Sequence, residues 1–318
     1  MTAASPASAV VFAYHNVGVR GLLTLLDAGV DVRMVVTHED NPQETLWFDR
    51  VADVAAEHGL PCIAPKDPHT SEVLAQLEAA KPDFLFSLYY RQMLKPAVLQ
   101  IPRRGAFNLH GSLLPKYRGR APVNWAVLHG ERETGATLHV MHEKPDHGPI
   151  VDQCAVPILG EDTARQVFDK VTLAAEIVLA RSVPRLIAGT ATFTPQVHAA
   201  GQYFGGRKPE DGRIPAAASA MQIHNLVRAV APPDYPGAFF DSPAGRVIVA
   251  RTRPAGHARH ARHPASPTFS LRLHEGQIWL DAADGQTLQV LGATLNSQSL
   301  NAKVWHSLLD TASLHPLP

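Results

Sequence analysis

The sequence predicts an α/β protein with a Rossmann-like parallel sheet, followed by a second, smaller OB-like β-barrel domain at the C-terminus. Over roughly the first 190 residues, short β-branched runs alternate with segments of helical spacing, and the connections are short. Beyond residue 237, short strand-like runs follow one another with only turns between them. The 318 residues are 45% hydrophobic, which is enough apolar material for two such cores.

The elements of the first domain follow from these alternating patterns. β-Branched and apolar runs predict strands over residues 10–14, 30–37, 61–64, 83–88, 106–110, 134–142 and 150–156. Helical spacing predicts helices over residues 19–28, 45–58, 71–80, 122–129 and 161–186. Gly29 and Gly59 are suited to end helices, and Pro122 to begin one. Acidic residues at the start of the last helix predict a favourable interaction with its dipole.

The first strand-to-helix turn argues against a dinucleotide-dependent enzyme. It contains the single Gly18 and lacks the G-x-G-x-x-G pattern that brings a backbone close to a pyrophosphate. Gly18 is interpreted as an ordinary turn residue.

The second domain is expected to be mostly strands. A glycine-rich connection over residues 201–212 places the first domain at residues 1–204 and the second at 205–318. A helix is expected over residues 216–230, and a hairpin turn at Asp284-Gly285. The expected strands span residues 237–240, 246–251, 268–273, 277–281 and 288–295.

Residues 254–267 are rich in Ala, Arg, His and Pro, with histidines at 257, 260 and 263. A metal site and a solvated loop are both open interpretations. The absence of an accompanying acid or cysteine favours the loop, and we expect no metal.

Charge and cysteine content exclude several functional classes. Lys plus Arg equal Asp plus Glu at 29 each, and the pI is near 7.3, so a nucleic-acid-binding surface is not expected. Two cysteines imply no disulfide framework. No apolar run approaches the roughly 20 residues of a membrane span. We therefore expect a cytoplasmic protein without a membrane partner.

Polar side chains at the ends of predicted strands form a candidate site. Asn108 and His110 lie two residues apart on one strand and so project from the same face. Asp146 follows the next strand, and ligands of open α/β sheets bind at such strand ends. An amide, an imidazole and a carboxylate suit acyl transfer, since they can stabilise an oxyanion, move a proton and stabilise an imidazolium. Three ordinary polar residues at strand ends are the alternative interpretation.

The segment from Phe107 to Pro122, FNLHGSLLPKYRGRAP, resembles the signature of the folate-dependent formyltransferases, and DHGPI at 146–150 resembles their D-x-G-x-I motif. The resemblance extends over about residues 10–300, including TGATLH at 134–139, YFG at 203–205, LVRAV at 226–230 and YPGAF at 235–239. It implies that Asn108, His110 and Asp146 are the catalytic set, and that 10-formyltetrahydrofolate is the cosubstrate.

The acceptor implied by the resemblance is a sugar nucleotide. Residues 37–45 are acidic and short, where methionyl-tRNA formyltransferases have a long Gly/Lys/Arg loop that would attract phosphates. This segment and residues 86–91 are similar to the formyltransferase domain of the UDP-4-amino-4-deoxy-L-arabinose formyltransferases of the lipid A pathway. Those proteins often carry a decarboxylase domain, so a separate decarboxylase partner is expected here. The alternatives are another amino-sugar nucleotide, methionyl-tRNA, and a non-catalytic nucleotide-sugar or folate-binding module.

The resemblance also implies ligand contacts. The folate is expected against Phe86, Ser87, Leu88, Tyr89, Tyr90, Arg91, Leu138 and Met141. Core packing is the alternative for Tyr89 and Tyr90. Arg118 and Arg207 are candidates for binding the nucleotide phosphates, with surface positions as the alternative. Ser112 is expected to be a loop-forming or substrate-contacting hydroxyl and not a nucleophile. Residues 206–211 resemble a family element but lack the tryptophan that usually follows it.

Overall fold

The computed structural model describes residues 6–40, 48–255, 264–308 and 313–317. The chain divides into two compact units, and each is described by itself. The first unit comprises Met1–Pro122, Glu133–Pro157 and Phe168–Gly205. The second comprises Val123–Arg132, Ile158–Val167 and Gly206–Pro318. The units separate near the expected connection, but two earlier segments group with the C-terminal part of the chain.

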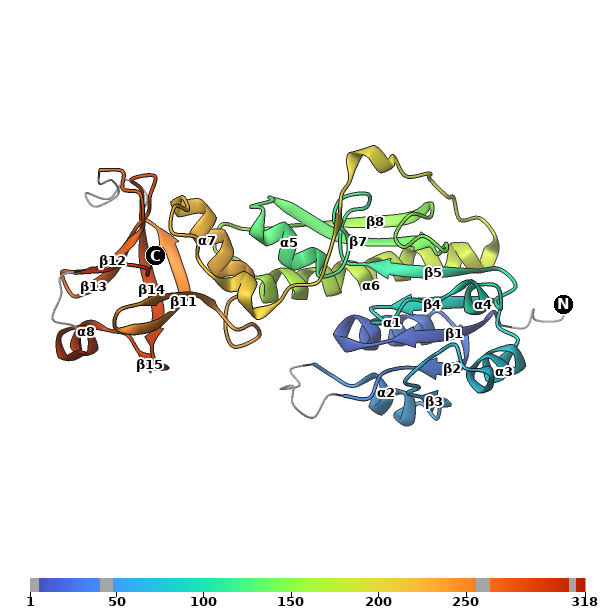
Figure 1. The fold of residues 1–318 in the computed structure, drawn as a ribbon. Helices are drawn as coiled ribbons and strands as arrows, with labels where there is room; N and C mark the ends of the chain where they lie inside the picture. The colour runs from blue at the N-terminus through green and yellow to red at the C-terminus, as the bar shows by residue number, and fades with distance from the viewer. Residues whose placement is uncertain (1–5, 41–47, 256–263, 309–312, 318) are drawn as a thin grey trace. The chain divides into compact units, whose positions relative to one another are not determined.

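The first unit is built on a sheet with strand order β3-β2-β1-β4-β5-β7-β8 (Figure 1). The five strands from β3 to β5 are parallel, whereas β7 is antiparallel to β5 and β8 to β7. The predicted Rossmann-like α/β sheet is confirmed, with an antiparallel extension beyond β5. The strands are β1 Ser8–Ala13, β2 Asp31–Val36, β3 Cys62–Ile63, β4 Phe84–Leu88, β5 Gly105–His110, β7 Glu133–Val140 and β8 Ile150–Pro157.

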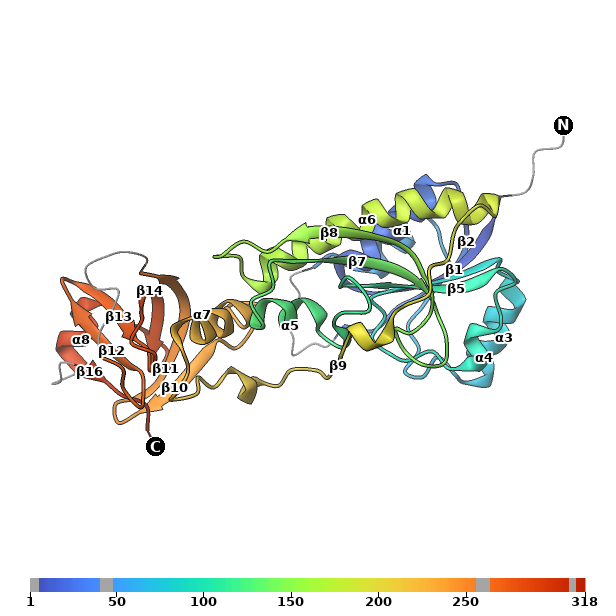
Figure 2. The same cartoon turned by 90° about the horizontal axis from the view of Figure 1, so that it is seen from above.

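Helices cover both faces of this sheet (Figure 2). They are α1 His15–Asp27, α2 Val51–Glu57, α3 Ser71–Ala80, α4 Pro96–Leu99 and α6 Ala164–Ala188, of which the part from Phe168 onward belongs to this unit. On one face, Phe12 and Val36 pack with Leu77 of α3 and Val98 of α4. On the other face, Gly21 lets α1 approach side chains of β4 and α6, since a Cβ there would crowd Leu88 and Leu179. Burial of these apolar faces stabilises the α/β layers.

Helices α6 and α2 begin later than the sequence pattern predicts. Helix α6 begins at Ala164, and its first turn contains no acidic residue, so the predicted dipole interaction is wrong. Glu161 precedes the helix and pairs with Arg253 at 2.6 Å, while Asp162 accepts the Leu159 N–H at 2.6 Å. Helix α2 begins at Val51, and residues 45–47 of the expected helix lie outside the described residues.

After α6, the segment Thr194–Phe204 runs back across the first unit, and we call it the strap (Figure 2). Thr194 forms a bridge with Ile150, and β9 (Tyr203–Phe204) pairs in parallel with β6 (Arg118–Gly119). Gly201 lies so close to Pro115 that a Cβ would overlap its carbonyl oxygen. The first part of the expected connection is therefore integrated into the first unit.

The second unit contains an antiparallel sheet that forms a nearly closed barrel, as predicted, with strand order β10-β11-β14-β13-β12-β16. Asp284-Gly285 lies in the turn between β13 and β14, with Gly285 at φ +78°. Its strands are β10 Ala238–Ser242, β11 Gly245–Pro254, β12 Ser270–His274, β13 Gln277–Asp281, β14 Thr287–Leu295, β15 Gln298–Ser299 and β16 Ser313–Leu314.

The second unit contains the helices α7 Ala220–Ala229 and α8 Ala302–Leu308, and α5 Pro122–Leu128 from Val123 onward. Helix α7 begins four residues later than expected because Ser219 and Gln222 form a capping box, in which each side chain accepts the other's N–H. Histidines 257, 260 and 263 lie outside the described residues, so the interpretation of that loop is not tested.

Candidate active site

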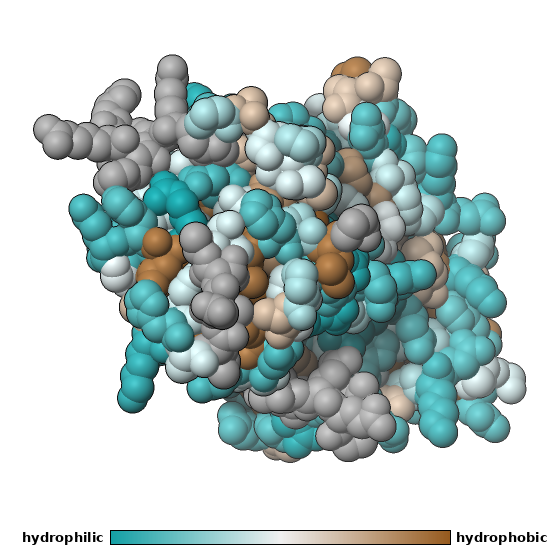
Figure 3. Space-filling model, turned by 60° about the vertical axis from the view of Figure 1, so that its left-hand side comes forward, coloured by the Kyte–Doolittle hydropathy of each residue, from teal (hydrophilic) through white to brown (hydrophobic). Residues whose placement is uncertain are grey.

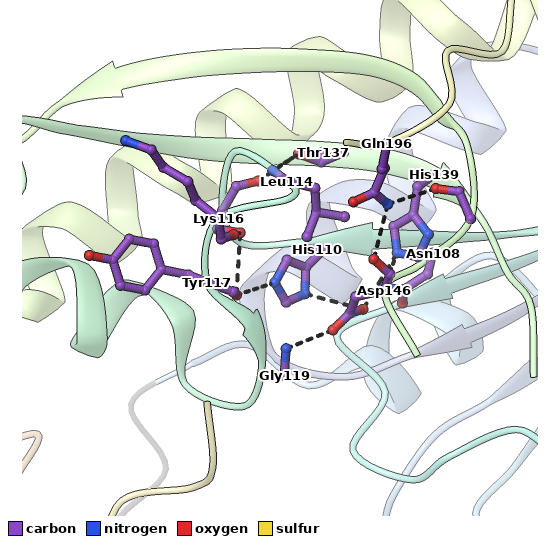
Figure 4. A network of polar contacts seen from close by, with 12 residues as sticks. Asn108, His110, Leu114, Lys116, Tyr117, Gly119, Thr137, His139, Asp146 and Gln196 are labelled. Carbon is purple, nitrogen blue, oxygen red and sulfur yellow. Dashed lines mark hydrogen bonds and ion pairs between the residues drawn. The ribbon is translucent and has the colours of Figure 1, made fainter. Parts of the chain in front are cut away.

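The strand pairing brings the predicted amide, imidazole and carboxylate together (Figure 4). Asn108 on β5 lies opposite His139 on β7, and His110 lies opposite Thr137. Asp146 comes from the loop between β7 and β8 and has a left-handed backbone, with φ +54°. All of these residues belong to the first unit, so one folded body forms the candidate site.

The Asp146 carboxylate lies between two imidazole rings. Its Oδ1 is 3.6 Å from His110 Nδ1 and 3.5 Å from His139 Nε2, and its Oδ2 accepts the Gly119 N–H at 2.8 Å. Burial acts to raise the pKa of Asp146, but the charge interactions with His110 and His139 and the hydrogen bonds outweigh it and hold this pKa well below its usual range. Asp146 is therefore ionised at neutral pH.

His110 is oriented by a backbone carbonyl. Its Nε2 lies 2.8 Å from the Tyr117 carbonyl oxygen, which can only accept, so Nε2 carries the proton of the neutral ring. Nδ1 is left facing Asp146. A second proton taken up at Nδ1 would be stabilised by the carboxylate. The Tyr117 carbonyl thus orients the His110 ring, and Asp146 contributes its charge.

His139 is a site residue that the sequence interpretation missed. Its Nδ1 donates to the Val140 carbonyl at 2.8 Å, so Nε2 of the neutral ring can accept from the Asn108 amide 3.1 Å away. This contact holds Asn108, whose amide is the candidate oxyanion donor. The available signal was an imidazole on a predicted buried strand, where it needs a polar partner.

Ser112 is part of the loop structure that follows β5. Its hydroxyl is fully buried and donates to the Lys116 carbonyl at 2.6 Å. Thr137 donates to the Ser112 carbonyl at 2.6 Å and accepts the Leu114 N–H at 3.1 Å. Of the two roles expected for Ser112, this geometry favours the loop-forming one, since no part of the hydroxyl is exposed to a ligand.

Arg118 is buried and engaged by the strap. Its guanidinium donates to the carbonyls of His198 at 3.2 Å and Gly201 at 2.7 Å, and it lies 3.1 Å from the His147 ring. Burial and the neighbouring charge of Arg118 lower the pKa of His147. Arg118 therefore joins the loop after β5 to the strap, and this differs from the open phosphate contact expected from the sequence.

Arg207 belongs to the second unit. Its guanidinium lies 4.8 Å from the centre of the Trp125 ring and 3.5 Å from the Asp211 carboxylate. Burial lowers the pKa of Arg207. The guanidinium is thus held by an aromatic face and an acid of its own unit.

The residues expected to bind folate divide into two groups. Phe86, Ser87 and Leu88 are buried in β4, which pairs with β1 on one side and β5 on the other. Their backbones are therefore engaged in a central strand. Tyr89, with φ +61°, and Arg91 lie beyond the strand end, where the Arg91 N–H donates to His38 Nε2 at 3.0 Å.

Tyr90 stacks on the His38 ring at a centroid distance of 4.1 Å and is buried with the core side chains. These surroundings favour the core-packing alternative for Tyr90. Leu138 is fully buried on β7, and the Met141 N–H already donates to the Ala106 carbonyl at 2.8 Å.

Gln196 on the strap is the second site residue that the sequence interpretation missed. Its side-chain amide donates to the carbonyls of Asp146 at 2.9 Å and Gly148 at 2.7 Å (Figure 4). No motif or periodicity marks this glutamine, because it lies in an irregular segment and acts through tertiary contacts.

Within the residues that the structure describes, no cluster of three or more His, Cys, Asp or Glu side chains is placed to hold a metal ion. Among the same residues, no helix combines the length and apolarity needed to cross a membrane.

Comparisons with known proteins relate this geometry to a family. The chain is similar in structure to the N-formyltransferase of Helicobacter canadensis in complex with folinic acid and dTDP-3-aminofucose, with 18% identity, a TM-score of 0.67, and coverage of 93% of this chain and 100% of that one. It is similar to WlaRD, a sugar 3N-formyltransferase, with 18% identity, a TM-score of 0.68, and coverage of 93% and 99%. It also resembles HypX from Aquifex aeolicus in complex with tetrahydrofolic acid, with 16% identity, a TM-score of 0.60, and coverage of 98% of this chain and 50% of that one.

At these identities the solved structures show the shared fold. The family itself is shown by sequence. Residues 21–183 match the formyl transferase family, and residues 207–307 match the formyl transferase C-terminal domain. Because the first match alone spans more than half of the chain, this protein belongs to the formyl transferase family and is a formyl-transferring enzyme.

Proposed function

We propose that this enzyme transfers a formyl group from 10-formyltetrahydrofolate to the amino group of a nucleotide-linked sugar. The observation that carries the proposal is the convergence of Asn108, His110 and Asp146 in one largely buried network of the first unit. Support for the substrates comes from the similar structures, one of which contains folinic acid with dTDP-3-aminofucose and another dTDP with 5-N-formyl-THF.

The chemistry needs no protein nucleophile. The sugar amine attacks the formyl carbon, and the carbonyl oxygen becomes an oxyanion that the Asn108 amide stabilises. His110 Nδ1 accepts the proton lost by the amine, and Asp146, 3.6 Å away, stabilises the resulting imidazolium. When the bond between the formyl carbon and folate N10 breaks, the proton passes to N10. The products are the N-formyl sugar nucleotide and tetrahydrofolate.

We place the folate beyond the end of β4, with Tyr89 and Arg91 as its contacts. This position is adjacent to Asn108, since Ser87 of β4 pairs with Asn108 of β5 in register. Ligands of open α/β sheets bind beyond the carboxyl ends of the strands. A formyl group delivered there would approach the amide and imidazole from the same edge of the sheet.

For the acceptor, we propose UDP-4-amino-4-deoxy-L-arabinose, with another amino-sugar nucleotide as the alternative. The balanced charge of 29 basic and 29 acidic residues supports a small acceptor over tRNA. The acidity of residues 37–45 supports it less than the sequence suggests, because Asp40 is paired with Arg50 at 2.6 Å. Glu39 is exposed, and residues 41–47 lie outside the described residues.

The acceptor can be identified in one assay. Purified protein and 10-formyltetrahydrofolate are incubated separately with UDP-4-amino-4-deoxy-L-arabinose, dTDP-3-aminofucose and initiator methionyl-tRNA, and the formylated product is measured by mass. We expect formylation of a sugar nucleotide and not of tRNA. Formylation of the tRNA alone would overturn the proposal.

The catalytic role of His110 has its own test. We expect His110→Ala to reduce turnover by roughly 10²- to 10⁴-fold, because it removes the proton acceptor. Circular dichroism should show that the variant remains folded. Turnover equal to that of the unmodified enzyme would refute this mechanism.

A further inference from the structure

The loop that presents Asp146 is held from two sides. On the side of the sheet, the Val140 N–H donates to the Pro149 carbonyl at 2.9 Å. Gly148 lies so close to Val140 that a Cβ would overlap the Val140 carbonyl oxygen. The other side of the loop faces the strap, where Gln196 binds two of its carbonyls and the His198 ring lies 3.1 Å from that of His147.

Gln196 is itself held in place by its neighbours. Two residues before it, Thr194 exchanges two backbone hydrogen bonds with Ile150, each 2.8 Å long. Gln196 is 9% exposed, so little solvent competes with its hydrogen bonds. Its amide nitrogen has two hydrogens, and the two carbonyls of Asp146 and Gly148 can accept one each, at 2.9 and 2.7 Å.

The backbone that Gln196 binds is in a conformation that is uncommon outside glycine, although aspartate adopts it more often than most residues. With φ +54°, Asp146 is in the left-handed region, which is less favourable than the right-handed helical and extended regions for a residue with a side chain, so contacts of the loop help to hold it there. In this conformation the carboxylate reaches between His110 and His139 and accepts the Gly119 N–H. Relaxation of the loop would move the charge away from the imidazole that it stabilises.

We propose that Gln196 is a positioning residue for formyl transfer: its amide binds the Asp146 and Gly148 carbonyls and thereby holds the Asp146 carboxylate against His110. Gln196 acts through Asp146 and touches no reacting atom. Its effect is therefore expected in the rate of the chemical step. Displacement of the carboxylate would reduce the stabilisation of the His110 imidazolium and would not remove a contact with a substrate.

Three variants separate this role from a purely structural one. Gln196→Met keeps the length of the side chain and removes both donors. Gln196→Glu keeps the shape and has a donor only when its carboxyl group is protonated. Gln202→Met is the matched control, because this glutamine is on the same strap with an exposed side chain.

We expect Gln196→Met to lower kcat by at least 30-fold and to change KM for either substrate by less than threefold. At pH 8, Gln196→Glu should lose as much kcat as Gln196→Met, because a carboxylate would then face two carbonyl oxygens. It should recover at least fivefold relative to the unmodified enzyme as the pH falls towards 5.5 and the carboxyl group acquires its proton. Gln202→Met should match the unmodified enzyme.

A second measurement does not depend on the acceptor. Carbon-13 NMR of the aspartate carboxyl groups should show Asp146 ionised from pH 7 down to pH 4 in the unmodified enzyme. In Gln196→Met the pKa of Asp146 should rise towards its ordinary value near 3.9, so that protonation begins within this range. If no sugar nucleotide is formylated, the proposed acceptor fails while this titration still tests Gln196.

The proposal is overturned if Gln196→Met keeps the kcat of the unmodified enzyme, or if the Asp146 titration is unchanged. A lower melting temperature with unchanged kcat would show that Gln196 contributes only to stability. A pH-independent defect in Gln196→Glu would contradict the requirement for a donor at this position.

Discussion

Asp146 carries a charge that both histidines of the site face. A largely buried carboxylate remains ionised only if hydrogen bonds and opposite charges compensate for the loss of water. The Gly119 N–H provides a hydrogen bond, and His110 and His139 provide an opposite charge when they are protonated. In the mechanism that we propose, the same carboxylate stabilises the proton that His110 Nδ1 accepts from the amine. At the scale of single residues, the ionised carboxylate of Asp146 thus links the charge of the site to the proposed proton transfer at His110.

Asp146→Asn tests this link, since it keeps the shape of the side chain and removes the charge. We expect kcat to fall by roughly 10²- to 10⁴-fold, because the protonated His110 loses its counter-charge. Steady-state kinetics with saturating folate and acceptor would measure the loss. The Gly119 N–H can still donate to the amide oxygen, so a folded variant with full activity would show that the charge is not needed.

Among the elements, the ends of β2 and β4 are joined by His38. Its Nε2 accepts the Arg91 N–H at 3.0 Å, and its ring stacks on Tyr90. Burial and the charge of Arg91 lower the pKa of His38 to about 4. The neutral ring therefore holds the start of the loop on which we place the folate.

This depressed pKa predicts a loss of stability in acid. The unfolded chain has a His38 pKa near 6.5 and binds a proton more readily than the folded protein, so stability falls as the pH decreases from about 6.5 towards 4. The shift corresponds to at most about 3 kcal/mol. Urea unfolding of the protein and of His38→Gln, which keeps an acceptor but does not titrate, should show a shallower pH dependence in the variant. Equal slopes would exclude His38 as the cause.

The strap is the other element that the site depends on. Thr194 bridges to Ile150, Gln196 binds the Asp146 loop, and Arg118 donates to the carbonyls of His198 and Gly201. A segment with almost no regular secondary structure thus connects the loop after β5 with the loop after β7. Its order comes from these contacts and not from local propensity.

At the scale of the whole molecule, the two units do not correspond to two continuous halves of the chain. In the second unit, His224 contacts the Gly160 carbonyl at 2.8 Å, and the buried Arg228 donates to the Asp162 carbonyl at 2.9 Å. Both acceptors come from Ile158–Val167, far earlier in the sequence than the barrel.

On the face seen in Figure 3, hydrophilic side chains predominate and hydrophobic ones are scattered between them.

We therefore expect residues 206–318 expressed alone to be less stable than the same unit in the full chain. Without the Leu159 and Asp162 carbonyls, Arg228 loses acceptors for a buried charge, which costs several kcal/mol. Thermal unfolding followed by circular dichroism should give a lower and broader transition for the fragment. A fragment extended to begin at Ile158 is the control, and it should regain part of the loss. Equal transitions for all three proteins would contradict the importance of these contacts.

The sequence by itself determined the α/β class, most of the strands and helices of the first unit, the barrel, and the family. These features depend on local periodicity and on short motifs, and both are readable along the chain. It also predicted that Asn108, His110 and Asp146 form a site, since their residue types lie in recognisable contexts at strand ends, and their catalytic roles stay a prediction.

Only the tertiary structure decided how those three side chains are arranged and which residues hold them. The register of β5 and β7 placed His139 beside Asn108, and the strap brought Gln196 to the Asp146 loop from 50 residues away. It also engaged Arg118 and Ser112 within the protein, where the sequence had left a ligand contact open as one of two roles for each. Such roles arise from hydrogen bonds between segments that are far apart in the sequence. Contacts of this kind form only when the chain folds, so they leave no periodic pattern in the sequence.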